Sequence, residues 1–345
     1  LVKHAGSVIV ELNTVQPPQL EGMHDIYIQE KPPRRTPIPI VHPGDRIGLP
    51  FVECGLDKIS CIVETAIPDR VRNLDPPDEK SEKIAQHLIG FLKGEQQSGR
   101  MPEPLLPIQS GVGTIANSVL HGLLHSDFQH ITMYSEILQD SVFDLIDAGK
   151  LDMASGCAFT PSPGVMARFR AEPERYRRRM ILRPLDITNH PEVIRRLGVI
   201  AINTALEFDI YGHANSTHQL GTQMMNGIGG SGDFMRNGYL TIFATESTAK
   251  GDNISRIVPM CSHVDSTEHD THIFITEWGV ADMRGLAPRE RPQVIIERCA
   301  HPLYRDQLRD YAKRAEKEGG HTPHLLEEAF SWHIDYKTGG SMLRS

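Results

Sequence analysis

The chain has 345 residues, of which 39% are hydrophobic and 23% charged. This composition is typical of a folded globular protein and excludes disorder as its main state, and the length predicts about two domains. The formal charge of -8, from 36 Lys and Arg against 44 Asp and Glu, disfavours nucleic acid as a partner. Five cysteines without a Cys-x-x-Cys pair favour free thiols in a reducing compartment. No apolar run approaches the ~18 residues of a membrane-spanning helix, so we expect no membrane span.

The first part of the chain resembles the end of a domain. Residues 7–14 and 59–67 are short and rich in β-branched side chains, which predicts two strands. The proline-rich stretch 32–45 between them must be extended or turning. Residues 73–80 are polar and contain prolines, which predicts a linker. Because the chain starts at Leu1 and enters a strand almost at once, we expect an upstream segment, including any targeting peptide, to precede it.

Beyond residue 80, apolar runs alternate with helical patterns, as in βα units around a largely parallel sheet. We expect a helix at 81–92 that opens with Ser81 as its cap. The later predicted elements are a strand and loop at 105–111, a helix at 114–124, a strand at 130–136, a helix at 141–149, strands at 198–212, 238–245, 255–260 and 271–277, and helices at 288–300 and 303–318. The predicted fold class is α/β, with an open, largely parallel sheet flanked by helices.

Residues with useful chemistry stand where predicted strands end. Glu136 directly follows a strand, so its carboxylate is expected in the crevice at the carboxyl end of the sheet. A glutamate that stabilises the first turn of a helix through the helix dipole would stand at the same position, and this explanation is equally good. Val112 and Gly113 precede a helix, and their backbone N–H groups are candidates to bind an anion or an oxyanion, although a plain tight turn gives the same pattern.

A glycine-rich run at residues 227–232 carries four glycines in six positions. Gly227, Gly229 and Gly230 belong to it, and such glycines expose backbone amides and allow a ligand to come close. The run matches neither the GxGxxG pattern of dinucleotide sites nor the GxxxxGK[ST] pattern of phosphate loops. A nicotinamide-dependent or nucleoside-triphosphate enzyme is therefore disfavoured.

Other features give weaker signals. Six arginines between residues 168 and 179 alternate with glutamates, which favours a solvated helical face over a phosphate site. His263, His269 and His272 lack the spacing of a metal site, so no metal ion is expected. Glu207 lies in a strand pattern, and we assign it a structural role.

Six segments, in this order along the chain, resemble the acetyl-CoA hydrolase/transferase family of class I CoA-transferases. They are GVGTIANSVL (111–120), YSEILQDSVFDLIDAG (134–149), LRPLDITNHPE (182–192), NTALEFDIYGHANST (203–217), MNGIGGSGDF (225–234) and ITEWGVADMRGL (275–286). The segments EGMHDIY (21–27) and HTPHLLEEAFSWH (321–333) suggest the eukaryotic hydrolase-like branch. Family members are longer, so the resemblance implies that residues 1–72 end an N-terminal domain and that residues 73–345 form the catalytic C-terminal domain, with a CoA-transferase-type sheet.

The resemblance implies that Glu136 is the nucleophile. Its carboxylate would attack the carbonyl of an acyl-CoA thioester, and the CoA thiolate would return to the glutamyl carbonyl to form an enzyme glutamyl-CoA thioester. Each tetrahedral intermediate carries an oxyanion, and the amides of Val112, Gly113 and Gly230 are the candidates to stabilise it.

The resemblance also assigns residues around the substrate. Asn189 and Glu277 are expected to line the acyl and carboxylate pocket, where Glu277 orients its neighbours. The residues expected to contact CoA are Gly227, Gly229 and Gly230 from the glycine run, Lys250 because it follows a predicted strand, and Arg70 because the family has an arginine near the CoA entrance. For Lys250, an exposed polar turn is an equally good explanation.

The function expected from the resemblance is transfer of CoA between a short acyl-CoA (acetyl-, succinyl- or propionyl-CoA) and a carboxylate such as acetate or succinate, in acetate and acetyl-CoA metabolism. CoA is then a substrate, and no tightly bound cofactor is expected. Two alternatives stay open: hydrolysis of acetyl-CoA, and a CoA-binding fragment without turnover because of the missing N-terminal domain. The full-length form is expected to be a homodimer in the mitochondrial matrix, with the cytoplasm as the alternative location.

Overall fold

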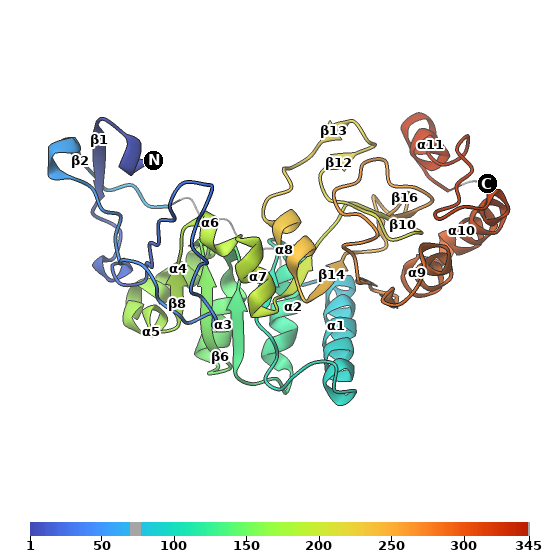
Figure 1. Cartoon of the computed structure of the whole chain (residues 1–345). Helices are drawn as coiled ribbons and strands as arrows, with labels where there is room; N and C mark the ends of the chain where they lie inside the picture. The colour runs from blue at the N-terminus through green and yellow to red at the C-terminus, as the bar shows by residue number, and fades with distance from the viewer. Residues whose placement is uncertain (70–76, 344–345) are drawn as a thin grey trace.

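An eight-stranded sheet forms the middle of the molecule (Figure 1). The computed structural model describes residues 1–69 and 77–343, so the predicted CoA contact Arg70 lies outside the described residues. The strand order is β19-β18-β14-β9-β3-β4-β6-β8, and neighbouring strands are parallel except β18 and β19. These strands are β3 (Ile108–Ser110), β4 (Ile131–Tyr134), β6 (Leu151–Gly156), β8 (Met180–Leu182), β9 (Ile200–Asn203), β14 (Leu240–Ala244), β18 (Ile273–Thr276) and β19 (Gly279–Asp282). The predicted α/β class with an open, largely parallel sheet is confirmed.

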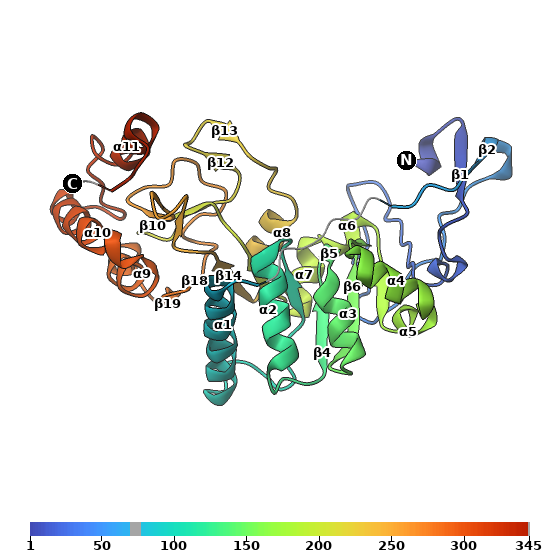
Figure 2. The ribbon, with the colours of Figure 1, turned by 180° about the vertical axis from the view of Figure 1, so that it is seen from behind.

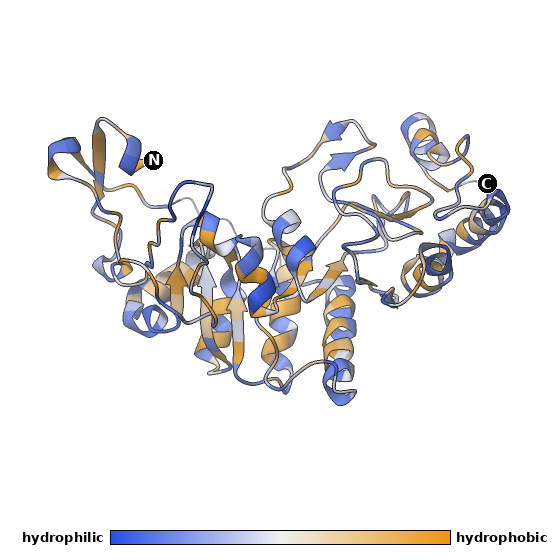
Figure 3. Cartoon of the chain, viewed as in Figure 1, coloured by the Kyte–Doolittle hydropathy of each residue, from blue (hydrophilic) through white to orange (hydrophobic). Residues whose placement is uncertain are grey.

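Helices cover both faces of the sheet (Figure 2). One face carries α1 (Glu79–Gln97), α2 (Thr114–His125) and α3 (Asp140–Asp147), and the other carries α7 (Pro191–Leu197) and α8 (Ser231–Asn237). The remaining α-helices are α4 (Pro163–Ala171), α5 (Pro173–Arg177), α6 (Leu185–Thr188), α9 (Arg291–Cys299), α10 (Pro302–Ala315) and α11 (Ser331–Gly339). Figure 3 shows hydrophobic strands between these helices, as expected for a parallel sheet buried on both faces.

Shorter strands lie outside the large sheet. β1 (Val8–Asn13) and β2 (Ile59–Thr65) form a parallel pair near the N-terminus, and they confirm the two strands predicted there. The other short strands are β5 (Ile137–Leu138), β7 (Ala158–Phe159), β10 (Glu207–Asp209), β11 (Ala214–Asn215), β12 (His218–Gln219), β13 (Gln223–Met224), β15 (Thr248–Ala249), β16 (Ile254–Ser255) and β17 (Ile257–Val258).

The predicted boundaries need three corrections. Helix α1 begins at Glu79 with Asp78 as its N-cap, and Ser81 is instead the reciprocal partner of a capping box. The single strand expected at 198–212 divides into β9 and β10, because the chain leaves the sheet after Asn203. The strand expected at 255–260 is likewise two short pieces, β16 and β17. Strands β6 and β8 are not among the elements predicted from the sequence.

A buried ion pair fixes the N-terminal segment against the β8 edge of the sheet. The amide of Asp25 donates to the carbonyl of Leu182 (2.8 Å), and the Asp25 carboxylate pairs with Arg183. Both charged side chains are almost fully buried, at 1% and 0% exposed. The Asp25 carboxylate also accepts from the backbone N–H of Gly48 at 2.7 Å, and Arg183 Nε donates to Ser155 Oγ at 2.6 Å. Every polar group of the pair therefore has protein partners, which a buried charge requires.

Breaking this pair is expected to destabilise the protein strongly. Asp25→Ala leaves the Arg183 guanidinium buried without its counter-charge, so the free energy of unfolding in urea should fall by about 3–5 kcal/mol. Lys83→Ala is the control, because it removes an ion pair with Glu79 that is exposed on α1, and it should leave the urea midpoint nearly unchanged. Equal effects of the two substitutions would contradict this account.

A second charged cluster predicts a pH-dependent stability. His213 Nδ1 lies 2.8 Å from an Asp209 oxygen, and Nε2 lies 2.8 Å from a Glu268 oxygen. Burial opposes protonation, but the hydrogen bonds and charges of the two carboxylates outweigh it and raise the pKa of His213. Protonated His213 therefore stabilises the folded protein. This contribution is fully present below the unfolded-state pKa of about 6.5, and it is lost as the pH rises through the folded-state pKa. We therefore expect His213→Gln to destabilise the protein more at pH 6 than at pH 9 in thermal unfolding; an equal loss at both pH values would contradict this.

Candidate active site

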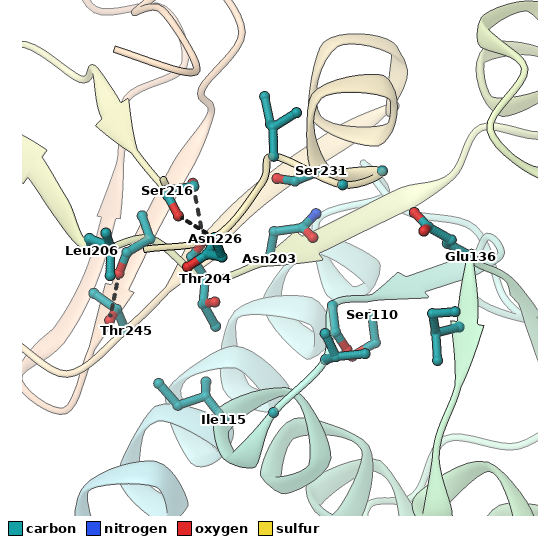
Figure 4. Close-up of a pocket in the computed structure, with 18 of the residues that line it drawn as sticks. Ser110, Ile115, Glu136, Asn203, Thr204, Leu206, Ser216, Asn226, Ser231 and Thr245 are labelled. Atoms are coloured by element: carbon teal, nitrogen blue, oxygen red, sulfur yellow. Dashed lines mark hydrogen bonds between the residues drawn. The ribbon is translucent and has the colours of Figure 1, made fainter. Parts of the chain in front are cut away.

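A cavity of about 540 Å³ opens at the carboxyl ends of β3, β4, β9 and β14 (Figure 4). The loops after these strands supply residues 110–115, 136–137, 203–206 and 245–246, and the glycine-rich segment 226–231 closes over them. In the sheet, β3 lies between β4 and β9. The chain first adds β4, β6 and β8 on one side of β3, and it then adds β9, β14, β18 and β19 on the other side. Open α/β sheets bind ligands at such a switch in strand order. The cavity therefore occupies the place where this fold is expected to hold a ligand.

Glu136 stands at one end of this cavity, two residues after the end of β4. Its carbonyl oxygen accepts a hydrogen bond from the backbone N–H of Cys157 (2.7 Å), which ties the turn after β4 to the turn after β6. Its carboxylate Oε2 accepts from Asn189 Nδ2 at 3.1 Å. A carboxylate at a cavity wall, held through both its backbone and its side chain, is in a suitable position to react with a bound ligand.

Asn189, at the end of α6, is itself held in one orientation. Thr188 Oγ1 donates to Asn189 Oδ1 (2.9 Å), so the Nδ2 group faces Glu136. Asp233 Oδ2, on α8, is a second acceptor at 3.4 Å. The structure thus brings two of the predicted site residues, Asn189 and Glu136, into direct contact.

Gly230 packs directly against this pair. A Cβ atom at Gly230 would lie 2.0 Å from Glu136 Oε2 and 2.6 Å from Asn189 Nδ2, so no residue with a side chain fits without displacing them. Gly227 and Gly229 also line the cavity, but a Cβ there would meet no atom within 4 Å. The glycine run therefore has one position at which close approach requires glycine.

The two other predicted oxyanion donors also line the cavity. Val112 is exposed over 56% of its surface, and Gly113 precedes α2 with a φ of 116° that favours glycine. The Gly113 N–H donates to Gln139 Oε1 at 3.2 Å. This amide must therefore exchange its partner before it can stabilise an oxyanion, and the donor roles of both residues stay predictions.

Two predicted contacts lie away from the cavity lining. Glu277 is 8% exposed, and its carboxylate accepts from Ser247 N (2.8 Å) and Ser247 Oγ (2.6 Å). Those contacts match a role in orienting neighbours. Lys250 is exposed in the turn between β15 and β16, with a φ of 54°. The substrate role of Glu277 and the CoA role of Lys250 stay predictions.

Some residues that line the cavity were not predicted from the sequence. Asn203 and Thr245 stand at or just beyond the ends of β9 and β14, so strand-end position alone was a usable signal. Asn203 exchanges side-chain hydrogen bonds with Gln109 of β3 at 3.2 and 2.8 Å. Arg256 also lines the cavity, and no motif or strand end marks it in the sequence.

The weaker sequence signals resolve into structural contacts. Arg168 pairs with Asp144 and Asp147 at 2.6 and 2.7 Å, which confirms the solvated charged face. Glu207 is buried and accepts from His333 Nε2 at 2.8 Å, in line with its structural role. Within residues 1–69 and 77–343, no group of three or more His, Cys, Asp and Glu is arranged to hold a metal ion, and no helix is long and apolar enough to cross a membrane.

Cys157 is a neighbour of Glu136, because its backbone N–H donates to the Glu136 carbonyl oxygen. Burial, reinforced by the Glu136 charge, raises the pKa of this thiol. Because the thiolate is the reactive form of cysteine, this environment disfavours Cys157 as a nucleophile.

Comparison with known proteins identifies the family. Residues 168–312 match the acetyl-CoA hydrolase/transferase C-terminal domain. Over 99% of its length, the chain is 54% identical to the succinyl-CoA:acetate CoA-transferase of Clostridium kluyveri and covers 64% of that protein. It is also 45% identical to the acetyl-CoA hydrolase of Neurospora crassa, over 100% of this chain and 67% of that protein. The chain belongs to the acetyl-CoA hydrolase/transferase family.

A solved structure has a similar fold. The crystal structure of RipA from Yersinia pestis superposes on this acetyl-CoA hydrolase/transferase family member with a TM-score of 0.62, at 27% identity, over 74% of this chain and 57% of RipA. The chain spans about two thirds of the length of the curated relatives named above.

The contact at Gly230 gives a sharp prediction. Gly230→Ala should displace the Glu136 carboxylate and lower its rate of reaction with acetyl-CoA roughly a hundredfold, because a misplacement of about 1 Å in a reacting group can carry that cost. Gly90→Ala is the control, since Gly90 is exposed on α1 outside the cavity lining and its new methyl group meets no atom within 4 Å. Rapid-quench measurement of the acetate released from acetyl-CoA in a single turnover would compare the two variants; equal rates would contradict the assigned contact.

Proposed function

We propose that the protein transfers CoA between a short acyl-CoA and a carboxylate through a thioester on Glu136. The observation that carries this proposal is the Glu136 carboxylate at the cavity wall, bonded to Asn189 at 3.1 Å and in contact with Gly230. The relatives named above support the substrate class, because one is a succinyl-CoA:acetate CoA-transferase. Acetyl-, succinyl- or propionyl-CoA are the proposed donors, and acetate or succinate the proposed acceptors.

In the first half-reaction, a Glu136 oxygen attacks the thioester carbonyl. The C–S bond breaks, CoA leaves as a thiolate, and an acyl-glutamyl anhydride remains. The thiolate then attacks the Glu136 side-chain carbonyl and the bond to the acyl oxygen breaks. The products are the free carboxylate and the glutamyl-CoA thioester, which conserves the energy of the original thioester.

The second half-reaction reverses these steps with another carboxylate. The acceptor attacks the glutamyl carbonyl, the thiolate leaves, and a new anhydride forms. Attack of the thiolate on the acceptor carbonyl yields the new acyl-CoA and regenerates the Glu136 carboxylate. No proton is transferred and no redox step occurs, so the proposed reaction uses CoA as a substrate and needs no tightly bound cofactor.

The residues around Glu136 have distinct parts in this scheme. Asn189 holds the carboxylate in one orientation and can donate to a substrate carboxylate. The amides of Val112, Gly113 and Gly230 are proposed oxyanion donors, and loss of one such donor typically costs about 3 kcal/mol in the transition state. Glu277 positions the loop after β14 through Ser247, while Gly227, Gly229, Lys250 and Arg70 are proposed CoA contacts.

Hydrolysis of acetyl-CoA is the second candidate function, and the relative of that name in Neurospora crassa favours it. Water would then attack the enzyme thioester in place of a carboxylate. Succinate distinguishes the two reactions: a transferase converts acetyl-CoA to succinyl-CoA, whereas a hydrolase consumes acetyl-CoA at the same rate with or without succinate.

Domain organisation, assembly and location complete the proposal. Residues 1–72 are proposed to end an N-terminal domain and residues 73–345 to form the catalytic domain. The contact of Asp25 with Arg183 joins these two parts of the chain. A homodimeric full-length form and a mitochondrial location are proposed, with the cytoplasm as the alternative; of the two curated relatives named above, one is fungal and one is bacterial.

The proposed intermediate predicts a covalent adduct. Mixing the chain with acetyl-CoA should give a mass increase in intact-protein mass spectrometry that Glu136→Gln abolishes, because an amide is a poor nucleophile. Glu246→Gln is the control, since Glu246 lines the same cavity from the loop after β14, and it should retain the adduct.

Three outcomes separate the alternatives. An adduct with succinyl-CoA formation supports the transferase. CoA binding, seen as a raised Tm, without an adduct favours a fragment that binds CoA but does not turn over. An adduct that persists in Glu136→Gln contradicts the assignment of the nucleophile.

A further inference from the structure

Arg256 brings a positive charge to the cavity and has no ion-pair partner in the part of the chain that the structure describes. It lies between β16 and β17, and its Nη1 donates to the carbonyl of Ala205 (3.3 Å) and to Thr245 Oγ1 (3.1 Å). Its Nε is buried and has no hydrogen-bond partner among the described residues. Within that same part of the chain, no carboxylate lies within 4 Å of its guanidinium.

The contrast with Arg183 shows why this arrangement needs an explanation. Arg183 is also buried, and it has Asp25 as a counter-charge and protein acceptors on its guanidinium. Burial lowers the pKa of Arg256, and the charges of Glu246 and Glu277 only partly compensate from a distance. A partly buried cation with an unsatisfied N–H group is costly unless a ligand pairs with it.

Neither nearby carboxylate is placed to satisfy Arg256. Glu277 is engaged by Ser247, at 2.6 and 2.8 Å. Glu246 lines the cavity and lies 3.7 Å from Lys80 Nζ, which offsets its negative charge. The end of the cavity at Arg256 therefore keeps a guanidinium available to an anionic ligand.

Arg256 and Glu136 lie at opposite ends of this cavity. Figure 4 shows Thr245, which accepts from Arg256, on the far side of the cavity from Glu136. The two ends follow β14 and β4, which are separated by β9 and β3. Three strand spacings correspond to about 14 Å. A ligand that spans this distance must have a long arm between its reactive atom and its anionic group.

We propose that Arg256 binds an anionic oxygen group of the substrate while the thioester reacts at Glu136. This inference rests on the proposed function and adds a substrate-binding residue to it. A phosphate of CoA fits the separation, because the pantetheine arm lies between the phosphates and the sulfur. The second carboxylate of a dicarboxylate acceptor has the same chemistry, although a four-carbon acid is much shorter than the cavity. In either case Arg256 determines which substrates bind tightly.

Binding measurements on Arg256→Met distinguish the two sources. The dissociation constants of CoA, pantetheine, succinate and acetate are compared by calorimetry for the parent chain, Arg256→Met and Arg256→Lys. Loss of a charged hydrogen bond should weaken binding roughly 10- to 100-fold. If the partner is a phosphate, CoA weakens and pantetheine does not; if it is the second carboxylate, succinate weakens and acetate does not. Arg256→Lys should recover part of the lost affinity because it keeps the charge.

A purely structural role for Arg256 gives a different pattern. In that case Arg256→Met would lower the ligand-free Tm and change all four affinities equally or not at all, and the proposal would be wrong. A ligand-free Tm that is unchanged or higher, together with a selective loss of affinity, supports it, because removing an unpaired buried charge relieves a cost.

The proposed function can fail separately from this inference. A Glu136 adduct that forms in the parent chain while Arg256→Met binds all four probes normally overturns the inference alone. A parent chain that forms no adduct and binds none of the probes overturns both.

Discussion

The short contact between the Glu136 carboxylate, the Asn189 amide and the backbone of Gly230 is the constraint on which the rest of the site depends. These residues come from three distant segments of the chain. Glu136 follows β4, Asn189 ends α6, and Gly230 precedes α8. The parallel sheet brings these segments together, because the loops that leave the carboxyl ends of parallel strands lie at the same edge of the sheet. The position of the carboxylate therefore depends on the turn after β4, the end of α6 and the start of α8.

The cavity has different electrostatic character at its two ends. At one end a carboxylate is held by a neutral amide, and at the other the Arg256 guanidinium has no counter-charge within 4 Å among the described residues. Such an arrangement suits a ligand with an electrophilic carbonyl and a remote negative charge. It also carries a cost in the ligand-free protein, since an unsatisfied cation near the interior is unfavourable. Binding of an anionic ligand to Arg256 would offset this cost.

Local patterns predicted the fold class and the position of Glu136 at the carboxyl end of the sheet, whereas its role as the nucleophile came from the family resemblance and stays a proposal. Alternation of apolar runs with helical periodicity indicates βα units, and Glu136 stands directly after such a run. The sequence does not indicate that the strand ends at Asn203. The apolar pattern continues into β10, although the chain has by then left the large sheet. Arg256 gave no local signal, since its significance depends on the absence of a partner in three dimensions. Glu277, assigned through the family resemblance, and Lys250, assigned because it follows a predicted strand, both lie outside the cavity lining.

A crystal structure of the chain after reaction with acetyl-CoA tests the central claim most directly. The account predicts a covalent bond between the CoA sulfur and the Glu136 side-chain carbonyl, with Asn189 and Gly230 beside the thioester and the pantetheine arm running through the cavity toward Arg256. CoA bound elsewhere on the molecule, or bound in the cavity with Glu136 unmodified and remote from the sulfur, would contradict it.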